Sequence, residues 1–300
     1  MDMSGRTTRV YIAEPSVPSH AVRRIQCALA DYAPEGILFA QNQSDADVLV
    51  VPVIGRRDRV AAALQRRRPG QRVALMQCCL RSTQCPSTND WQAVWAECDV
   101  VWSYYPLEAW IAEEGGRPLG SKFYGTPLGV EAVFTGPNQS APRPYIMCSS
   151  GRHWTQESAR EIALAAGRVG RPVVHLGPPM RRAWVRSVSN LSDVELRRYY
   201  QQSEFVSGLR RVEGFELPAA EGLLCGARPV LFDQWHYRQW FGSWADYIHE
   251  GSRQEVEDQL VALFTRGARP VTTSEIESAR AVFDWARIVR GFWARVHNGG

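Results

Sequence analysis

Lysine is almost absent from this chain of 300 residues, since Lys122 is the only one and the other basic residues are arginines. The chain also lacks a run of about 20 apolar residues, the length that a membrane-spanning helix needs. Its first fourteen residues hold no apolar stretch typical of a secretory signal. We therefore expect a cytoplasmic protein without an integral membrane segment. Arginine is then the cation available to bind phosphate bidentately.

Cysteines at the spacing of a metal site are lacking as well. The seven cysteines are scattered and odd in number, which argues against a disulfide framework. The segment 78–85 contains three of them but has no matching Cys or His pair nearby. An Asp-x-Asp at 45–47 precedes an apolar segment, so it would lie at the wrong end of a parallel sheet for a ligand, and we interpret it as a turn. We predict no metal and no cofactor.

Short apolar segments alternate with helical ones along the whole chain. Strands are expected at 8–14, 46–54, 72–78, 99–105, 144–150, 172–177, 204–209 and 227–233, and helices at 19–32, 57–68, 88–97, 155–170, 192–202 and 218–226. The helix at 155–170 is expected to begin with a Thr cap, and the one at 192–202 with a capping box. Such alternation indicates βαβ units and parallel sheets.

A segment rich in Gly, Pro, Ser and Asn interrupts this pattern at 136–145 and predicts a linker. We expect an α/β protein with two Rossmann-like domains and a cleft between them. The domains are predicted at 1–135 and 146–272. A long amphipathic helix at about 273–297, within a final segment 273–300, is expected to cross back to the N-terminal domain.

Two glutamates, Glu213 and Glu221, are separated by seven residues in the segment RRVEGFELPAAEGLLCGARPVLFD, which begins at Arg210. The segment follows a predicted strand, at the edge where doubly wound sheets bind ligands. Pro218 suits the first turn of a helix, whose free N–H groups would attract a diphosphate together with the adjacent arginines. We expect Glu221 to accept hydrogen bonds from a ribose and Glu213 from a sugar. The structural alternative is a capped helix with surface acids.

This segment resembles the donor-binding signature of GT-B-fold retaining glycosyltransferases, the large family-4-like group. The matching residues are Glu213, Gly214, Phe215, Leu217, Pro218, Glu221, Cys225 and Gly226. The segments 101–115, 124–134 and 149–154 also resemble parts of that family, so the likeness runs from about 100 to 235. It implies a GT-B fold and the transfer of a sugar from a nucleotide-diphosphate sugar, expected to be a UDP-sugar, to a hydroxyl group, with retention and without a metal.

The resemblance also assigns roles to individual residues. The catalytic residues that it implies are Glu213, Arg152 and Arg210. The donor-binding residues that it implies are Gly151, Arg152, Arg211, Gly214, Phe215, Glu216, Leu217 and Glu221. Two departures from the family pattern stand out. Glu216 replaces a glycine and is expected to add a carboxylate near the sugar, and the lysine that usually follows the Gly-Arg pair is missing, so Arg210 or Arg211 is expected to replace it. If neither does, the alternative is an inactive two-Rossmann-domain binding protein.

Arginine is concentrated in the half that is expected to bind the acceptor. Residues 56–81 contain eight arginines against one acid, a net charge of +7. Arg56, Arg57 and Arg59 follow a predicted strand and are expected to meet an anionic acceptor, whereas those at 66–68 end a helix and are expected to be structural. The other acceptor-binding candidates are Ser16, His20, Trp235 and Tyr237, the last two within an aromatic segment at 233–244.

The identity of the acceptor stays open at this point. The chain also resembles the compact, virus-encoded glycosyltransferases that act on hydroxymethylated bases in DNA, and the arginine-rich window suits such an acceptor. We favour DNA on that ground. A bacterial glycan or lipid, a small molecule and a protein remain alternatives.

Overall fold

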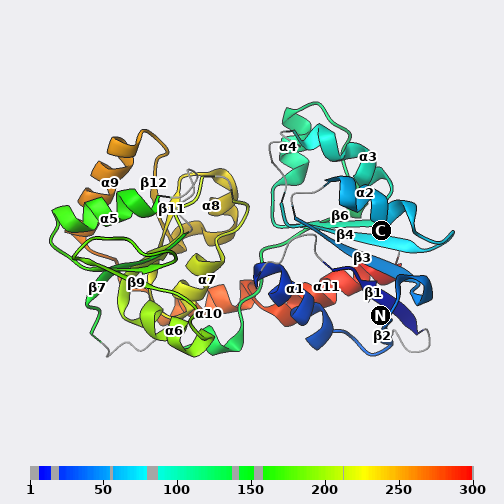
Figure 1. Cartoon of the computed structure of the whole chain (residues 1–300), viewed down its shortest axis with the longest axis horizontal. Coiled ribbons are helices and arrows are strands. Elements are labelled where there is room, and N and C mark those ends of the chain that lie inside the picture. Colours follow the sequence, from blue (N-terminus) through cyan, green and yellow to red (C-terminus); the bar gives the residue numbers. More distant parts are fainter. Residues whose placement is uncertain are drawn as a thin grey trace. The chain divides into compact units, whose positions relative to one another are not determined.

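The computed structural model describes residues 7–14, 20–54, 57–79, 87–136, 142–151, 158–211 and 213–298. The chain forms two compact units, which are described separately: Met1–Leu128 with Trp285–Gly300, the first unit, and Gly129–Asp284, the second unit. Within the described residues each unit contains a six-stranded sheet whose paired strands are parallel (Figure 1). The predicted α/β architecture with two Rossmann-like halves is confirmed.

The sheet of the first unit has the strand order β2-β1-β3-β4-β5-β6. Its strands are β1 (Thr8–Ile12), β2 (Ile37–Phe39), β3 (Val48–Val53), β4 (Arg72–Gln77), β5 (Val100–Ser103) and β6 (Phe123–Gly125). The helices are α1 (His20–Asp31), α2 (Arg57–Gln65), α3 (Gln92–Ala96), α4 (Leu107–Glu113) and α11 (Trp285–Asn298), with 3-10 turns η1 (Gln43–Asp45), η2 (Thr88–Trp91) and η3 (Gly120–Lys122). Every residue of β3 is buried, as its uninterrupted apolar sequence predicts for a strand covered on both faces.

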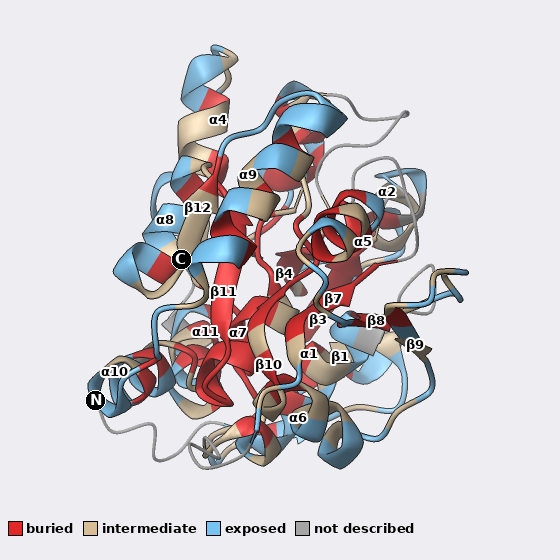
Figure 2. Ribbon diagram, turned by 90° about the vertical axis from the view of Figure 1, so that its left-hand side faces the viewer, coloured by how far each residue is buried: buried red, intermediate tan, exposed pale blue. Residues whose placement is uncertain are grey.

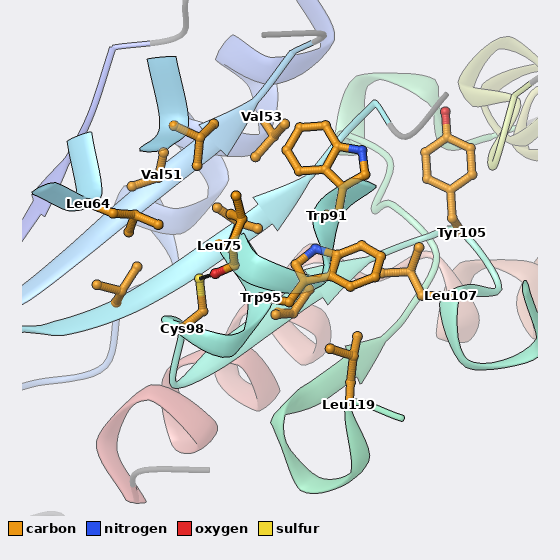
Figure 3. Packing of buried hydrophobic residues seen from close by; sticks show 14 of the residues in the cluster. Val51, Val53, Leu64, Leu75, Trp91, Trp95, Cys98, Tyr105, Leu107 and Leu119 are labelled. Carbon is orange, nitrogen blue, oxygen red and sulfur yellow. Dashed lines mark hydrogen bonds between the residues drawn. The ribbon is translucent and has the colours of Figure 1, made fainter. Parts of the chain in front are cut away.

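The core on one side of this sheet is built around two tryptophans. Trp91 and Trp95 are each 1% exposed and lie among aliphatic side chains of β3, β4 and α4 (Figure 3). The Trp95 indole N–H donates to the Gln77 side-chain oxygen at 3.0 Å, and the Gln77 amide donates to the Cys79 carbonyl at 2.5 Å. Because both buried polar groups have partners, these hydrogen bonds fix the end of β4 and helix α3 against each other.

Helix α11 belongs to the first unit although it ends the chain. It lies beside α1 (Figure 1), where the Trp293 indole donates to the Leu29 carbonyl at 3.1 Å. The Tyr124 hydroxyl donates to the Ile288 carbonyl at 2.9 Å, and the Arg72 guanidinium donates to carbonyls in the last turn. These contacts join α11 to strands and helices more than 160 positions earlier in the sequence.

The single long helix predicted at 273–297 was wrong. Helix α10 (Thr273–Val282) lies in the second unit and ends before Phe283, and α11 starts at Trp285. The Phe283 carbonyl accepts the N–H of Val130 at 2.9 Å instead of a helical N–H, and its ring is buried among other aromatic rings. Periodicity alone does not report such a break, because both helices keep an apolar face across it.

The sheet of the second unit has the order β12-β11-β10-β7-β8-β9. Its strands are β7 (Tyr145–Ser150), β8 (Val173–Leu176), β9 (Val185–Val188), β10 (Ser203–Ser207), β11 (Arg228–Phe232) and β12 (Asp246–Ile248). The helices are α5 (Ala159–Arg168), α6 (Asp193–Gln201), α7 (Leu217–Leu224), α8 (Trp235–Phe241), α9 (Arg253–Arg266) and α10, with 3-10 turns η4 (Ala132–Phe134) and η5 (Gly242–Trp244). The chain therefore builds β8 and β9 on one side of β7 and β10 to β12 on the other, which is the Rossmann order.

Several boundaries in the second unit differ from those predicted. The unit begins at Gly129, earlier than the predicted 136–145 linker, because Phe134 is fully buried and its carbonyl accepts the Cys225 thiol at 3.2 Å. The expected Thr cap at 155 lies outside the described residues, and α5 has Ser158 at its N-cap position. The capping box predicted for α6 is confirmed, with Ser192 and Glu195 bonded reciprocally.

Helix α10 is fixed to the sheet by an arginine that is buried completely. Arg228, at the start of β11, is 1% exposed, and all five of its guanidinium N–H groups have acceptors. Two of them bind the Glu275 carboxylate at 3.0 and 3.1 Å, and the others bind the carbonyls of Trp244, Arg269 and Pro270. A buried guanidinium is tolerated only with such complete pairing.

We expect Glu275→Gln to destabilise the fold by about 3 kcal/mol at pH 7, because it leaves the Arg228 charge buried without a counter-charge. Partial burial alone would raise the pKa of Glu275, but hydrogen bonds from Arg228 and the Thr272 N–H and the Arg228 charge lower that pKa to about 2. A lowered folded-state pKa gives stability that is present above the ordinary value of 4.5 and is lost as the pH falls towards 2.

Urea unfolding of the wild type and the variant at pH 7 and pH 3 measures this difference. Glu277→Gln, an exposed acid on the same helix, is the matched control and should leave stability within about 0.5 kcal/mol. An equal difference between wild type and Glu275→Gln at both pH values would contradict the assignment.

Candidate functional site

The strand order of the second unit reverses between β7 and β10, and the carboxyl ends of these two strands define the candidate site. They pair directly, with Ser207 beside Ser149. Ligands of doubly wound sheets bind outside the carboxyl edge at such a reversal. The loop that leaves β7 begins at Gly151, and the loop that leaves β10 is Gly208–Leu209–Arg210, so the predicted Gly151 and Arg210 both lie at this edge.

Three backbone segments approach one another unusually closely here. A Cβ atom added to Gly208 would lie 3.0 Å from the Ser150 carbonyl oxygen, and one added to Gly177 would lie 2.0 Å from the Gly151 carbonyl oxygen. Any side chain at these two positions would push the strand ends apart. Gly177 and Gly208 were not among the predicted site residues, although glycine at the end of a strand in a βαβ unit is a usable signal.

The loop after β10 is strained and is held by hydrogen bonds. Leu209 is fully buried and has a φ of 45°, in the left-handed region that leucine rarely adopts. Its N–H donates to the Ser207 hydroxyl at 2.6 Å. The N–H groups on either side of it, those of Gly208 and Arg210, donate to the Glu216 carboxylate at 3.2 and 3.0 Å.

Glu216 therefore lies inside the protein and not in a sugar pocket. It occupies the N-cap position of α7, is 0% exposed and also accepts a hydrogen bond from the Arg210 guanidinium at 3.3 Å. The expectation that it presents a carboxylate to the sugar was wrong, because its oxygens are directed into the loop. Pro218 lies in the first turn of α7, as predicted.

Arg210 and Arg211 extend from this edge in different directions. The Arg210 side chain is 21% exposed beside Glu216. The Arg211 guanidinium donates to the Ser158 hydroxyl at 3.1 Å and lies over the Phe232 ring, with its carbon 4.9 Å from the ring centroid. Arg211 thus lies between the end of β11 and the start of α5. The predicted Arg152 lies outside the described residues.

Some of the remaining residues of the predicted motif are half-buried, and others belong to the core of the second unit. Glu213 is half-buried, and its carbonyl accepts the His236 ring N–H at 2.8 Å. Gly214 is buried and Leu217, the first residue of α7, is half-buried. Phe215 is 4% exposed and stacks on Phe241 with ring centroids 5.5 Å apart. The ring therefore belongs to the aromatic core, and donor binding by Phe215, which was expected through the backbone N–H groups of this segment, stays a prediction.

Glu221 lies one turn into α7 and is 2% exposed. Its carboxylate accepts the Tyr200 hydroxyl at 2.8 Å. Helix α7 and strand β11 are mostly buried (Figure 2). Burial raises the pKa of the Cys148 and Cys225 thiols, and the Glu221 charge raises both further. The direct contact of Glu221 with a ribose stays a prediction.

Only one of the two aromatic acceptor candidates presents its ring to solvent. Trp235, the first residue of α8, is 47% exposed. Tyr237 is 0% exposed and its hydroxyl donates to the Arg210 carbonyl at 3.1 Å, so the expectation that it stacks on a sugar or base was wrong. His236, 6% exposed, joins α8 to the Glu213 turn, and burial lowers its pKa.

The acceptor candidates of the first unit are only partly described. Ser16, Arg56 and the side chains of His20 and Arg59 lie outside the described residues. Arg57 is exposed, and its guanidinium donates to the Asp90 carbonyl at 2.6 Å. The predicted structural role of the arginines at 66–68 is confirmed for two of them. Arg67 donates to the Glu97 carbonyl at 2.7 Å, and Arg68 to the Ala46 carbonyl at 2.6 Å.

The Asp-x-Asp segment is a turn, as predicted: η1 includes Asp45, and the Asp47 carboxylate accepts the Arg9 N–H at 2.9 Å. Across the described ranges, no group of three or more His, Cys, Asp or Glu side chains could hold a metal ion. None of the helices in the same ranges is long and apolar enough to cross a membrane.

Comparison with known proteins finds similarity in structure but not in sequence. No family model matches the chain, and no curated protein matches it. A sucrose-phosphate synthase from Thermosynechococcus elongatus has a TM-score of 0.70 at 12% identity, over 98% of this chain and 99% of that one. A glycosyltransferase involved in avilamycin A biosynthesis has a TM-score of 0.62 at 13% identity, over 96% of each chain.

A third similar structure is an alpha-glucosyltransferase in complex with UDP-glucose and DNA containing an abasic site. Its TM-score is 0.60 at 10% identity, over 97% of this chain and 100% of that one. At such identities these likenesses show the fold, which is the GT-B fold predicted from the sequence.

We expect Tyr237→Phe to lower the free energy of unfolding by about 1 kcal/mol, because it removes a buried hydrogen bond to the Arg210 carbonyl. Trp235→Phe, two positions earlier in the same helix, changes an exposed ring and should lower it by less than about 0.5 kcal/mol. Urea unfolding of both variants measures the two values. The reverse order would contradict the placement of these rings.

Proposed function

We propose that the protein is a glycosyltransferase that moves a sugar from a nucleotide-diphosphate sugar, with UDP-sugar as the first candidate, to a hydroxyl group. The observation that carries the proposal is the carboxyl edge of the second sheet. There, glycines allow the strand ends to approach closely, and Arg210, Arg211 and the start of α7 lie at the same edge. The similar structures support it, since one of them was solved with UDP-glucose.

The chemistry of a departing diphosphate explains why these groups suit the reaction. Negative charge grows on the leaving diphosphate as its bond to the sugar breaks. Two guanidiniums and the N–H groups at the start of a helix bind that charge more strongly in the transition state than in the ground state. We propose that Arg210, Arg211 and Arg152 act in this way, without a metal or another cofactor, and that Glu213 contacts the sugar. Retention of configuration is part of the proposal and follows from the family resemblance.

We expect Arg211→Ala to lower kcat for UDP-glucose by roughly tenfold or more and to raise KM less, because the arginine acts mainly on the growing charge. Arg152→Ala should behave in the same way. Release of UDP, followed with a panel of nucleotide sugars, measures both constants. Arg198→Ala, an exposed arginine at the C-terminal end of α6, is the control and should leave both unchanged.

This experiment also separates the enzyme from an inactive binding protein. A wild-type protein that binds UDP in calorimetry but releases none from any nucleotide sugar, with every acceptor class supplied, would support the binding protein. A rise in KM with unchanged kcat in Arg211→Ala would show that the arginine binds ground state and transition state equally.

For the acceptor, we propose DNA that carries a hydroxymethylated base. The supporting observations are the net charge of +7 at residues 56–81, the exposed Arg57 and the exposed Trp235, an aromatic ring on which a base can stack. The DNA-containing complex among the similar structures is consistent with this choice. A glycan or lipid acceptor is the alternative, because an arginine-rich segment also suits an anionic lipid or a phosphorylated glycan.

If arginines of this window neutralise DNA phosphates, affinity for duplex DNA should fall steeply with salt, with a logarithmic slope of about −0.9 per phosphate contacted. Replacing Arg56, Arg57 and Arg59 by alanine should reduce that slope by up to roughly 3 and leave UDP binding intact. Fluorescence anisotropy at several salt concentrations measures the slope. Transfer of sugar to a glycan or lipid but never to hydroxymethylated DNA would overturn the DNA assignment alone.

A further inference from the structure

One carboxylate holds both the backbone and the side chain of the same arginine at the candidate site. Glu216 accepts the Arg210 backbone N–H at 3.0 Å through one oxygen. Its other oxygen accepts the Arg210 guanidinium at 3.3 Å and the Gly208 N–H at 3.2 Å. Arg210 is also fixed at its carbonyl, which accepts the Tyr237 hydroxyl at 3.1 Å. The arginine is therefore held at three separate groups.

Burial makes the charge of Glu216 expensive unless a cation compensates it. The Glu216 side chain is 0% exposed, whereas that of Arg210 is 21% exposed. Moving a carboxylate out of water costs several kcal/mol, which hydrogen bonds and a partner charge must offset. The buried member of the pair therefore depends on Arg210, and Arg210 reaches from it towards the surface at the strand edge.

The Arg210 and Glu216 side chains have little room to move, because Gly208 lies close to both. A Cβ on Gly208 would lie 2.9 Å from the Arg210 guanidinium carbon and 3.0 Å from a Glu216 carboxylate oxygen. Between the two N–H groups that Glu216 binds lies Leu209, with its left-handed φ of 45°. An unconstrained arginine loses much side-chain entropy when it is immobilised. An arginine that the protein has already fixed loses less on binding a ligand.

We infer that Glu216 is a positioning residue, which orients the Arg210 guanidinium for the diphosphate of the donor. This inference rests on the proposed function. The retaining GT-B family that the sequence resembles has glycine at the position of Glu216, and its usual lysine after the Gly-Arg pair is missing here. The carboxylate thus accompanies Arg210, one of the two arginines that are expected to replace the lysine, and it would orient that arginine.

A double-mutant cycle tests this coupling. UDP and inorganic pyrophosphate are titrated in a calorimeter into the wild type, Glu216→Gln, Arg210→Ala and the double variant, and thermal unfolding of each is recorded. We expect Glu216→Gln to weaken binding of both probes about tenfold in the wild-type background and less than about twofold in the Arg210→Ala background. A merely structural role would lower the unfolding temperature but weaken binding equally in both backgrounds.

The outcomes separate the inference about Glu216 from the proposed function. Equal weakening in both backgrounds, or none in either, overturns the inference and leaves the proposed function standing. A wild-type protein that binds neither UDP nor pyrophosphate overturns the proposed function together with the inference. If Glu216→Gln does not fold, Glu216→Asp replaces it, because it keeps the charge but shortens the side chain that reaches the Arg210 guanidinium. Its effect on binding should likewise disappear in the Arg210→Ala background, and persistence there counts against the inference.

Discussion

The close approach of backbone segments at the carboxyl edge of the second sheet is the constraint on which the candidate site depends. Gly177 and Gly208 permit it, because a side chain at either position would meet a neighbouring carbonyl oxygen. The strand ends can then lie against each other where the strand order reverses, and their loops leave in a defined direction. The loop that leaves β10 at this edge contains the strained Leu209, with its left-handed φ of 45°. The strain is offset by the hydrogen bonds that Glu216 and Ser207 accept from the loop.

Three buried charged groups of the second unit, Arg228, Glu216 and Glu221, all have hydrogen-bond partners. Arg228 has acceptors for all its donors, Glu216 has three donors, and Glu221 accepts a hydroxyl. Each charged group connects elements that are distant in sequence or joins a loop to a helix. The pair at Arg228 stabilises the fold far from the strand edge, whereas the pair at Glu216 extends to the edge through Arg210. Both pairs join an arginine to a glutamate, but they differ in position. The Arg228 pair stabilises the fold, whereas the Glu216 pair holds an arginine at the strand edge.

Local patterns in the sequence predicted most of the secondary structure. The buried strands β3, β4, β7 and β11 are nearly continuous apolar runs, and the capping box of α6 is visible in four residues. The short strands β2, β9 and β12 were not predicted, because three or four residues near a sheet edge are too few for a period to appear. The break between α10 and α11 depends on a hydrogen bond from Val130, which lies more than 150 positions away in the sequence.

The positions of the site residues could be predicted better than their environments. Trp235 and Tyr237 are two positions apart in one short helix, yet one ring is half-exposed and the other is enclosed. The aromatic segment at 233–244 identifies both as candidates without telling which face of the helix is covered. The environment of Glu216 could not be predicted either. A glutamate after Gly-Phe suggests a surface acid, and only the structure shows that its carboxylate accepts the N–H groups of Gly208 and Arg210.

Net charge counted along the sequence is a weak guide to where an anion binds. The window at 56–81 owes its charge to arginines, but Arg57, Arg67, Arg68 and Arg72 all donate to backbone carbonyls of other segments. Arginine has five donors, so one guanidinium can bind a carbonyl and still present N–H groups to a phosphate. A phosphate that approaches such a residue meets a guanidinium already oriented by the fold. In both units arginines are thus fixed by hydrogen bonds to the protein. They use several donors in a fixed geometry, which a lysine ammonium does not offer, in a chain that has almost no lysine.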